Sequence, residues 1–232
     1  MQERDLIDKL ERFETGWFPQ HAESFKAMVR DGQHPSTLFI GCSDSRVVPY
    51  VLMDCGPGEL FIVRNVGNLV PPWDSTGDAH GTAAAIEFAT AVLEVNHIVV
   101  CGHSHCGAMR ALYEEPPACC KHLRGWLSHA YDARLPVAAS AEALRRVEQR
   151  NIVLQLSSLM SYPMVEARIA SGSLFLHGWH YLLDEGVVLV FDPATREFRP
   201  RGDYSFSGST AAVMRAESDA QRWCMQPHDR SV

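Results

Sequence analysis

The spacing of apolar residues near the N-terminus is typical of amphipathic helices. Apolar side chains return there every three or four residues, so they share one face of a helix. We expect two such helices, with a break near Gly16 to Pro19 and an end at Asp31-Gly32. The apolar positions that carry the pattern are Leu6, Ile7, Leu10, Phe13, Phe25, Met28 and Val29.

Further along the chain, short continuous runs of apolar residues indicate strands that are buried on both faces. Stretches with helical periodicity at 81–95 and 142–161 predict helices between these runs. Strands that alternate with helices are typical of an α/β fold, so we expect a mainly parallel β-sheet of about five strands flanked by helices. The predicted strands are 37–41, 59–64, 97–101, 173–176 and 187–191, the last two around a turn at 184–186.

The length of the chain, 232 residues, predicts a single domain. We place this α/β domain at 1–200, including an N-terminal helical arm at 1–31. Residues 201–232 are rich in Ser, Asp, Arg and Gly and have little periodicity, which predicts a polar C-terminal tail.

Charge and hydropathy exclude several function classes. The formal net charge is −7 and the Lys and Arg residues are scattered, so the chain lacks the basic surface of a nucleic-acid-binding protein and is not attracted to anionic membranes. Half of the first ten residues are charged, and no apolar stretch approaches the ~20 residues that span a bilayer. We therefore expect a cytoplasmic protein that binds neither nucleic acid nor membrane.

The cysteines point to metal binding or chemistry rather than to disulfide bonds. They number seven, and an odd count without a secretory signal argues against a disulfide framework. Cys101 lies within a predicted strand, and we interpret it as a core residue.

Two polar loops follow directly after predicted strands. One reads Cys-Ser-Asp-Ser-Arg at 42–46 and the other reads His-Ser-His-Cys-Gly at 103–107. The carboxyl ends of neighbouring parallel strands lie at the same edge of a sheet, so we expect Cys42, His103 and Cys106 to converge. Two thiolates and one imidazole suit Zn²⁺, and three protein ligands leave a fourth position for water. A single buried Cys is more often a small hydrophobic residue, so it is the pair of loops that favours a catalytic metal site.

Asp44 and Arg46 lie two residues apart in the first loop and can form a bidentate ion pair. Asp44 could be a fourth metal ligand, or it could accept a hydrogen bond from metal-bound water while Arg46 holds it off the metal. Zinc with two thiolates and a neutral imidazole is formally neutral, so a third anionic ligand is less favourable. The alternative is an ordinary surface pair worth less than ~1 kcal/mol.

Together, the two loops resemble the zinc-binding motifs of the β-class carbonic anhydrases. Segments 61–71 and 176–179 are also similar to this family, and the resemblance extends to about residue 200. It implies an enzyme with one Zn²⁺ per subunit that catalyses the reversible hydration of CO₂ to bicarbonate and a proton by zinc-bound hydroxide. It also implies a homodimer or homotetramer whose N-terminal helices pack on a neighbouring subunit.

By position, the resemblance assigns Cys42, His103 and Cys106 as zinc ligands and Asp44 and Arg46 as the catalytic pair. It also implies that a glutamine and a backbone N–H bind substrate, and that three apolar side chains line a small pocket, partly from the neighbouring subunit. Ordinary core packing is the alternative for these apolar side chains. The substrate-binding residues are Gln33, Gly107, Phe61, Val66 and Phe88.

Further residues are candidates for regulation and for proton transfer, and two other functions are alternatives to CO₂ hydration. Some family members have an inactive form in which the aspartate binds zinc, stabilised by bicarbonate near a tryptophan, an arginine and a tyrosine. Arg64 and Tyr181 match this set, but Phe39 stands in the tryptophan position. His80 and His105 are loop candidates for proton transfer to buffer. Alternative functions are hydrolysis of CS₂ or COS at the same zinc site and a non-catalytic zinc-containing bicarbonate sensor.

Overall fold

The structure is a computed structural model that describes residues 3–74 and 80–203. The chain divides into two compact units, Met1–His34 and Pro35–Val232, and we describe each by itself. Among the described residues, no helix combines the length and the apolar character needed to cross a bilayer. Apart from residues 201–203, the predicted C-terminal tail lies outside the described residues, so the domain boundary at 200 stays a prediction.

The first unit is continuously helical from Glu3 to Asp31, and the predicted break near Gly16 to Pro19 is wrong. The backbone N–H of Phe18 bonds to the carbonyl oxygen of Phe13, so a π-helical turn replaces the break. Pro19 has no N–H to donate, and the wider turn before it absorbs the change in hydrogen-bond register. The predicted end is confirmed, with Gly32 at φ +83°. The elements are α1 (Glu3–Arg12), the π-helical turn (Phe13–Trp17) and α2 (Phe18–Asp31).

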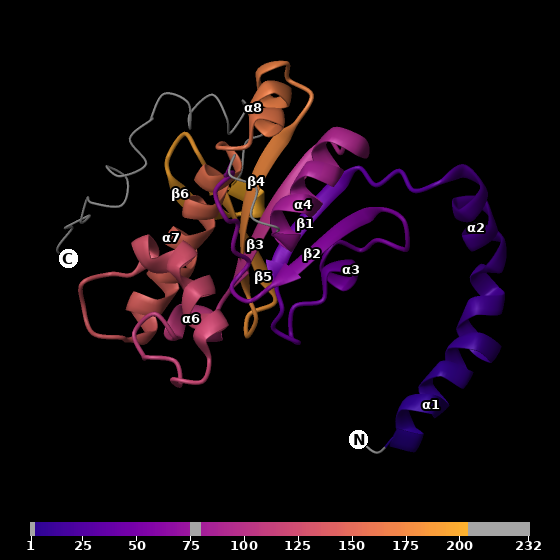
Figure 1. Ribbon diagram of the computed structural model, residues 1–232, viewed down its shortest axis with the longest axis horizontal. Coiled ribbons are helices and arrows are strands. Elements are labelled where there is room, and N and C mark those ends of the chain that lie inside the picture. Colours follow the sequence, from indigo (N-terminus) through magenta and orange to yellow (C-terminus); the bar gives the residue numbers. More distant parts are fainter. Residues whose placement is uncertain (1–2, 75–79, 204–232) are drawn as a thin grey trace. The chain divides into compact units, whose positions relative to one another are not determined.

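The second unit is built on one six-stranded sheet with the order β2-β1-β3-β4-β5-β6 (Figure 1). The first four strands in this order are parallel, and the pairs β4–β5 and β5–β6 are antiparallel. The α/β fold with a mainly parallel sheet is thus confirmed, with six strands where about five were predicted. The strands are β1 (Thr37–Cys42), β2 (Leu60–Asn65), β3 (His97–His103), β4 (Phe175–Leu182), β5 (Val187–Asp192) and β6 (Glu197–Pro200).

Two parts of this sheet were not predicted, because their sequences contain no continuous apolar run. The residues of β6 are exposed or half-buried, so the strand contains no apolar run. β4 continues to Leu182, beyond the predicted end at 176, because buried residues there alternate with half-buried ones such as His177 and Trp179. An alternating pattern is typical of a strand that is fully covered on one face only.

The predicted helices at 142–161 and 81–95 are confirmed, although the second changes to a π-helical turn and ends at Val92. The longer helix is capped by the residue before it, Ser140, whose side chain accepts a hydrogen bond from the N–H of Ala143. The remaining helices are short and were not predicted. The α-helices are α3 (Pro49–Leu52), α4 (Gly81–Glu87), α5 (Gly107–Arg110), α6 (Lys121–Leu127), α7 (Ala141–Leu159) and α8 (Pro163–Ala170). The π-helical turn is Phe88–Val92, and two 3₁₀ turns are Ser128–Ala133 and Arg201–Asp203.

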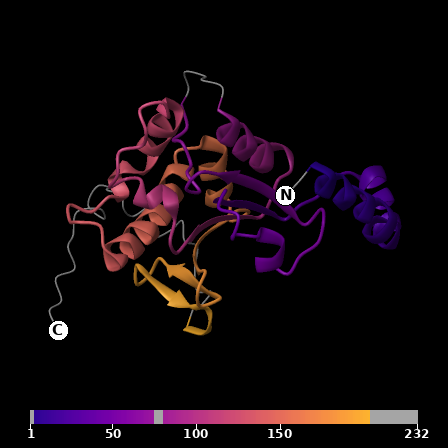
Figure 2. The same ribbon diagram turned by 90° about the horizontal axis from the view of Figure 1, so that it is seen from below.

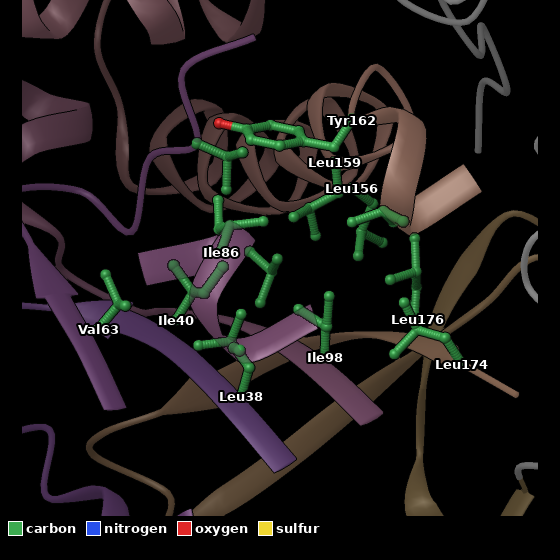
Figure 3. Packing of buried hydrophobic residues seen from close by; sticks show 14 of the residues in the cluster. Leu38, Ile40, Val63, Ile86, Ile98, Leu156, Leu159, Tyr162, Leu174 and Leu176 are labelled. Carbon is green, nitrogen blue, oxygen red and sulfur yellow. The ribbon is translucent and has the colours of Figure 1, made fainter. Parts of the chain in front are cut away.

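The main core lies between one face of the sheet and the helices α4, α7 and α8 (Figure 2). Leu38, Ile98 and Leu176 from three neighbouring strands point toward Leu156 and Tyr162 from the helical layer (Figure 3). All five side chains are fully or almost fully buried. This packing fixes β1 and β3 side by side, and their carboxyl ends carry the candidate site.

A smaller cluster with Phe39, Val99 and Cys101 lies apart from the main core. Burial raises the pKa of the Cys101 thiol to about 12, so this thiol stays protonated. The interpretation of Cys101 as a core residue is confirmed, and it is not a candidate ligand.

Candidate metal centre

Three potential metal ligands meet at the carboxyl ends of two neighbouring parallel strands. Cys42 is the last residue of β1 and His103 is the last residue of β3, and these strands pair directly. A tight turn with His105 at φ +58° brings Cys106 to the same place. The two sulfur atoms and a ring nitrogen of His103 lie within 4.8 Å of one another. No other such group of three occurs among the residues that the structure describes.

One nitrogen atom of His103 has no partner. The side chain is fully buried, and Nδ1 lies 2.9 Å from the carbonyl oxygen of Ser104, which assigns the ring proton to Nδ1. Nε2 is then an acceptor, and it makes no hydrogen bond. A buried polar atom without a partner is unfavourable, and a metal ion would satisfy this one. Two sulfur atoms and one imidazole nitrogen are a donor set that fits Zn²⁺.

The two thiols of the centre influence each other strongly. A hydrogen bond from the Cys106 thiol lowers the pKa of Cys42 to about 4, although burial opposes this shift. The same interaction, together with burial, raises the pKa of Cys106 well above its usual value. The two thiols therefore do not ionise independently of each other. A divalent ion would displace any proton that they hold, because metal binding requires both thiolates.

The first cysteine loop is held from β2 and from the turn that follows β2. Arg64 donates to the carbonyl oxygen of Cys42 at 2.9 and 3.1 Å and to that of Asp44 at 2.6 Å. The N–H of Gly67 donates to the sulfur of Cys42 over 3.4 Å. The thiolate of this loop thus faces a fixed hydrogen-bond donor.

The second cysteine loop is held by Glu148 on α7, a residue that sequence analysis missed. The carboxylate is 3% exposed and accepts a hydrogen bond of 3.1 Å from the N–H of Cys106. Its other oxygen lies 3.1 Å from Nε2 of His180. Glu148 stands on the buried face of a predicted helix, where an ionisable residue is rarely found without a partner. That mismatch is the signal that could have identified it.

Asp44 and Arg46 form the close ion pair that the sequence predicts. Nε and Nη2 of Arg46 donate to the two carboxylate oxygens at 2.9 and 2.7 Å, and the backbone N–H of Arg46 adds a bond of 3.0 Å. Arg46 also donates to the carbonyl oxygen of His105 at 3.2 Å, which ties the two loops together. These bonds hold the pKa of Asp44 well below its usual range. The carboxylate lies 3.9 Å from Nε2 of His103, beside the ligand group.

The residues assigned to a substrate pocket are only partly covered in one chain. The rings of Phe61 and Phe88 stack with their centroids 5.8 Å apart, and Phe88 and Val66 are each 41% exposed. Gly107 is the first residue of α5. Gln33 lies in the first unit, after the end of α2, and its role in substrate binding stays a prediction.

The residues considered for a bicarbonate switch and for proton transfer have varied surroundings. Phe39 is fully buried, and half-buried Tyr181 packs against its cluster. Arg64 is engaged with the loop carbonyl oxygens described above. His105 is exposed and His80 is half-buried. The roles of all five residues stay predictions.

Comparison with known proteins connects this geometry to a family. A sequence profile described as carbonic anhydrase matches residues 37–188. A carbonic anhydrase from Pseudomonas aeruginosa is 42% identical over 203 residues, which cover 84% of this chain and 90% of that protein. The solved structure of the β-carbonic anhydrase CcaA superposes with a TM-score of 0.78 at 37% identity, covering 85% of this chain and 98% of that one. A tetrameric β-carbonic anhydrase from Sordaria macrospora gives a TM-score of 0.68 at 28% identity, covering 80% and 96%.

The matched residues include the three candidate ligands and the ion pair beside them. Fold, motif spacing and overall similarity agree along most of the chain. The chain belongs to the β-carbonic anhydrase family, whose members are lyases that hydrate CO₂.

Proposed function

We propose that this chain is a zinc-dependent carbonic anhydrase that hydrates CO₂ reversibly at the centre formed by Cys42, His103 and Cys106. The observation that carries the proposal is the buried group of Cys42, His103 and Cys106, whose three potential ligand atoms lie within 4.8 Å of one another. Zinc bound there would supply the Lewis acidity that lowers the pKa of a water molecule toward ~7.

Asp44 has the charge and the support to orient the attacking water. Because Arg46 keeps the carboxylate ionised, Asp44 accepts a hydrogen bond and cannot donate one. The O–H of the water then turns toward Asp44, which leaves a lone pair for the carbon of CO₂. The ion pair also restrains Asp44 from becoming a third anionic metal ligand.

The substrate requires an apolar surface more than an ionic anchor, because CO₂ is small, linear and uncharged. We assign this surface to Phe61, Val66 and Phe88, and we assign polar contacts with the substrate to Gln33 and the N–H of Gly107. The exposure of Val66 and Phe88, 41% each, supports a pocket that a neighbouring subunit completes.

A homodimer or homotetramer is part of the proposal. Among residues 4–34 no side chain is buried, although the helices there carry many apolar residues. Tetramers are described for the Sordaria macrospora enzymes. The exposed apolar side chains are Leu6, Ile7, Leu10, Phe13, Trp17 and Val29. We also propose a cytoplasmic location, which cell fractionation tests.

The test measures zinc content and CO₂ hydration by stopped flow on the purified protein, from about pH 6 to about pH 9. We expect one Zn²⁺ per chain and rapid hydration. Turnover of COS or CS₂ without turnover of CO₂ would replace the proposal with a hydrolase. Bound zinc without hydration at any pH in this range would replace it with a bicarbonate sensor.

A further inference from the structure

Helix α7 carries three polar side chains in one row on its buried face. Glu148, Asn151 and Gln155 follow one another at intervals of three and four residues and are 3%, 1% and 0% exposed. Their neighbours Ile152 and Leu156 belong to the main core. Burying a carboxylate and two amides is unfavourable unless each is hydrogen-bonded, so the partners of this row identify what it supports.

The first partner is the main chain of one sulfur ligand. Glu148 accepts the N–H of Cys106 at 3.1 Å, and its second oxygen lies 3.1 Å from Nε2 of the fully buried His180. Nδ1 of His180 in turn lies 3.4 Å from the side-chain amide of Gln149. The carboxylate is therefore fixed from both sides, and it fixes the loop of Cys106.

The second partner is Gly67, which itself donates a hydrogen bond to the sulfur of the other cysteine, Cys42. The side-chain amide of Asn151 donates to the carbonyl oxygen of Gly67 at 3.1 Å, and the N–H of Gly67 donates to the sulfur of Cys42 at 3.4 Å. Gly67 has φ +84°, and a Cβ atom there would lie 3.0 Å from the Cβ of Ala108. Position 67 therefore favours glycine over any other residue, and the hydrogen bond from Asn151 holds this turn in place.

Gln155 sets the orientation of Asn151. Its amide nitrogen donates to Oδ1 of Asn151 at 2.9 Å, which turns the NH₂ group of Asn151 toward Gly67. Its amide oxygen accepts the N–H of Val70 at 2.7 Å, at the far end of the same turn. The amide nitrogen of Gln155 also donates to the carbonyl oxygen of His129 at 3.1 Å. Glu148 thus contacts the loop of Cys106, whereas Asn151 and Gln155 contact the turn that faces Cys42.

From these contacts we infer that Glu148 and Asn151 are positioning residues that hold both cysteine ligands from a single helix. The inference rests on the proposed zinc function, and both residues act through the groups that they hold. Groups that orient metal ligands in this way are usually worth 10- to 100-fold in metal affinity or activity.

The bond from Gly67 also has an electronic consequence. An N–H donated to a thiolate draws charge from the sulfur, so the sulfur gives less charge to the metal ion. Two thiolates donate more charge than two imidazoles, and this hydrogen bond offsets part of that difference. Asn151 would therefore influence the bond between Cys42 and a metal ion without contacting either partner.

The test compares Glu148→Leu, Glu148→Gln, Asn151→Leu and Asn151→Asp in the full-length holoenzyme. Zinc affinity is measured by competition with a chelator, and the sulfur-to-metal charge-transfer band is recorded after replacement of zinc by Co²⁺. We expect Glu148→Leu and Asn151→Leu to bind zinc about 10- to 100-fold more weakly. Glu148→Gln should recover most of the affinity, because its amide oxygen still accepts the N–H of Cys106. Both Asn151 variants should shift the cobalt band.

Tyr162→Phe is the matched control. The buried hydroxyl of Tyr162 donates to the carbonyl oxygen of Pro71 at 2.8 Å, so this change also removes one buried side-chain hydrogen bond to a backbone carbonyl. We expect it to lower the unfolding temperature of the metal-free protein while leaving zinc affinity and the cobalt band unchanged.

Two results would overturn the inference. In the first, the Leu variants lose stability, but their zinc affinity and cobalt band are the same as those of Tyr162→Phe. The row of polar side chains on α7 would then be purely structural. If the Leu variants do not fold, Asn151→Asp, which keeps the shape of the side chain, replaces them in the test. An unshifted cobalt band in Asn151→Asp is then the result that overturns the inference. A wild-type protein that binds no zinc would instead refute the proposed function.

Discussion

Two of the potential donor atoms of the metal centre are oriented by specific hydrogen bonds. The carbonyl oxygen of Ser104 leaves Nε2 of His103 free, and the N–H of Gly67 faces the sulfur of Cys42. Removing a donor atom therefore differs from removing a neighbour of that atom. The first change should abolish metal binding, and the second should only weaken it.

Loss of a donor gives the most direct prediction. Cys42→Ser and His103→Ala should each lose zinc and nearly all CO₂ hydration, because each removes one of three protein ligands. Metal analysis and stopped-flow assays measure both quantities. Cys55→Ser is the control, since Cys55 lies outside the ligand group. Stoichiometric zinc in Cys42→Ser or His103→Ala would show that the residue replaced is not a ligand.

Asp44→Asn separates chemistry from metal binding. The amide has nearly the same shape but can donate a hydrogen bond, so it orients water wrongly while the three ligands remain. We expect normal zinc content and a loss of kcat of roughly 10²–10⁴. Glu197→Gln serves as the control, because Glu197 and Arg199 form an exposed pair with the same two-residue spacing. Unchanged turnover in Asp44→Asn would remove Asp44 from the mechanism.

At the scale of elements, the sequence is most informative where a motif follows directly after a buried strand. Cys42 and His103 could be placed at one edge of the sheet because each ends an apolar run and parallel strands share that edge. The contact between Glu148 and Cys106 could not be foreseen in this way, since it joins segments that are far apart in the sequence. β6 was missed for another reason, because an exposed edge strand has no apolar pattern to read.

Two glycine substitutions, one in the turn after β2 and one in α6, should have opposite effects on stability. Gly67→Ala forces a side chain into φ +84° with its Cβ 3.0 Å from that of Ala108, and should lower the free energy of unfolding by roughly 1–3 kcal/mol. Gly125 lies within α6, and a Cβ atom there would meet no neighbouring side chain or loop within 4 Å. Gly125→Ala should therefore raise stability by about 0.5–1 kcal/mol. Urea denaturation measures both values, and equal effects would contradict the assigned conformation of Gly67.

The pairing of β3 with β4 predicts a pH effect on stability. Nδ1 of His97 lies 3.1 Å from Nε2 of His177, and burial, with a smaller contribution from His97, lowers the pKa of His177 to about 4. The unfolded chain binds this proton near pH 6.5, and the folded chain does not. The free energy of unfolding should therefore fall as the pH decreases from about 6.5 to about 4, by up to about 3 kcal/mol from this group. His177→Gln should flatten the profile over that range, and an unchanged profile would contradict the assignment.

At the scale of the whole molecule, the centre and the helical arm belong to different units. All three candidate ligands lie in the second unit, whereas the exposed apolar side chains of α1 lie in the first. Metal binding and subunit association should therefore respond to different substitutions.

Light scattering should report a mass of two or four chains for the wild-type protein. Leu10→Asp should lower this mass because it places a charge on the exposed apolar face of α1, while zinc content stays the same. Gln20→Asp adds the same charge at an exposed polar position and should leave the mass unchanged. A monomeric wild-type protein would end the proposal of an oligomer.

The order of segments along the chain has a consequence for biosynthesis. The last thiol of the centre is residue 106, but the helix that bonds to the loop of Cys106 and to the turn facing Cys42 begins at Ala141. During translation, both thiols are therefore synthesised before α7, the helix that holds them in place. Slower elongation through this stretch would lengthen the interval in which oxidants and competing soft cations can reach the nascent thiols.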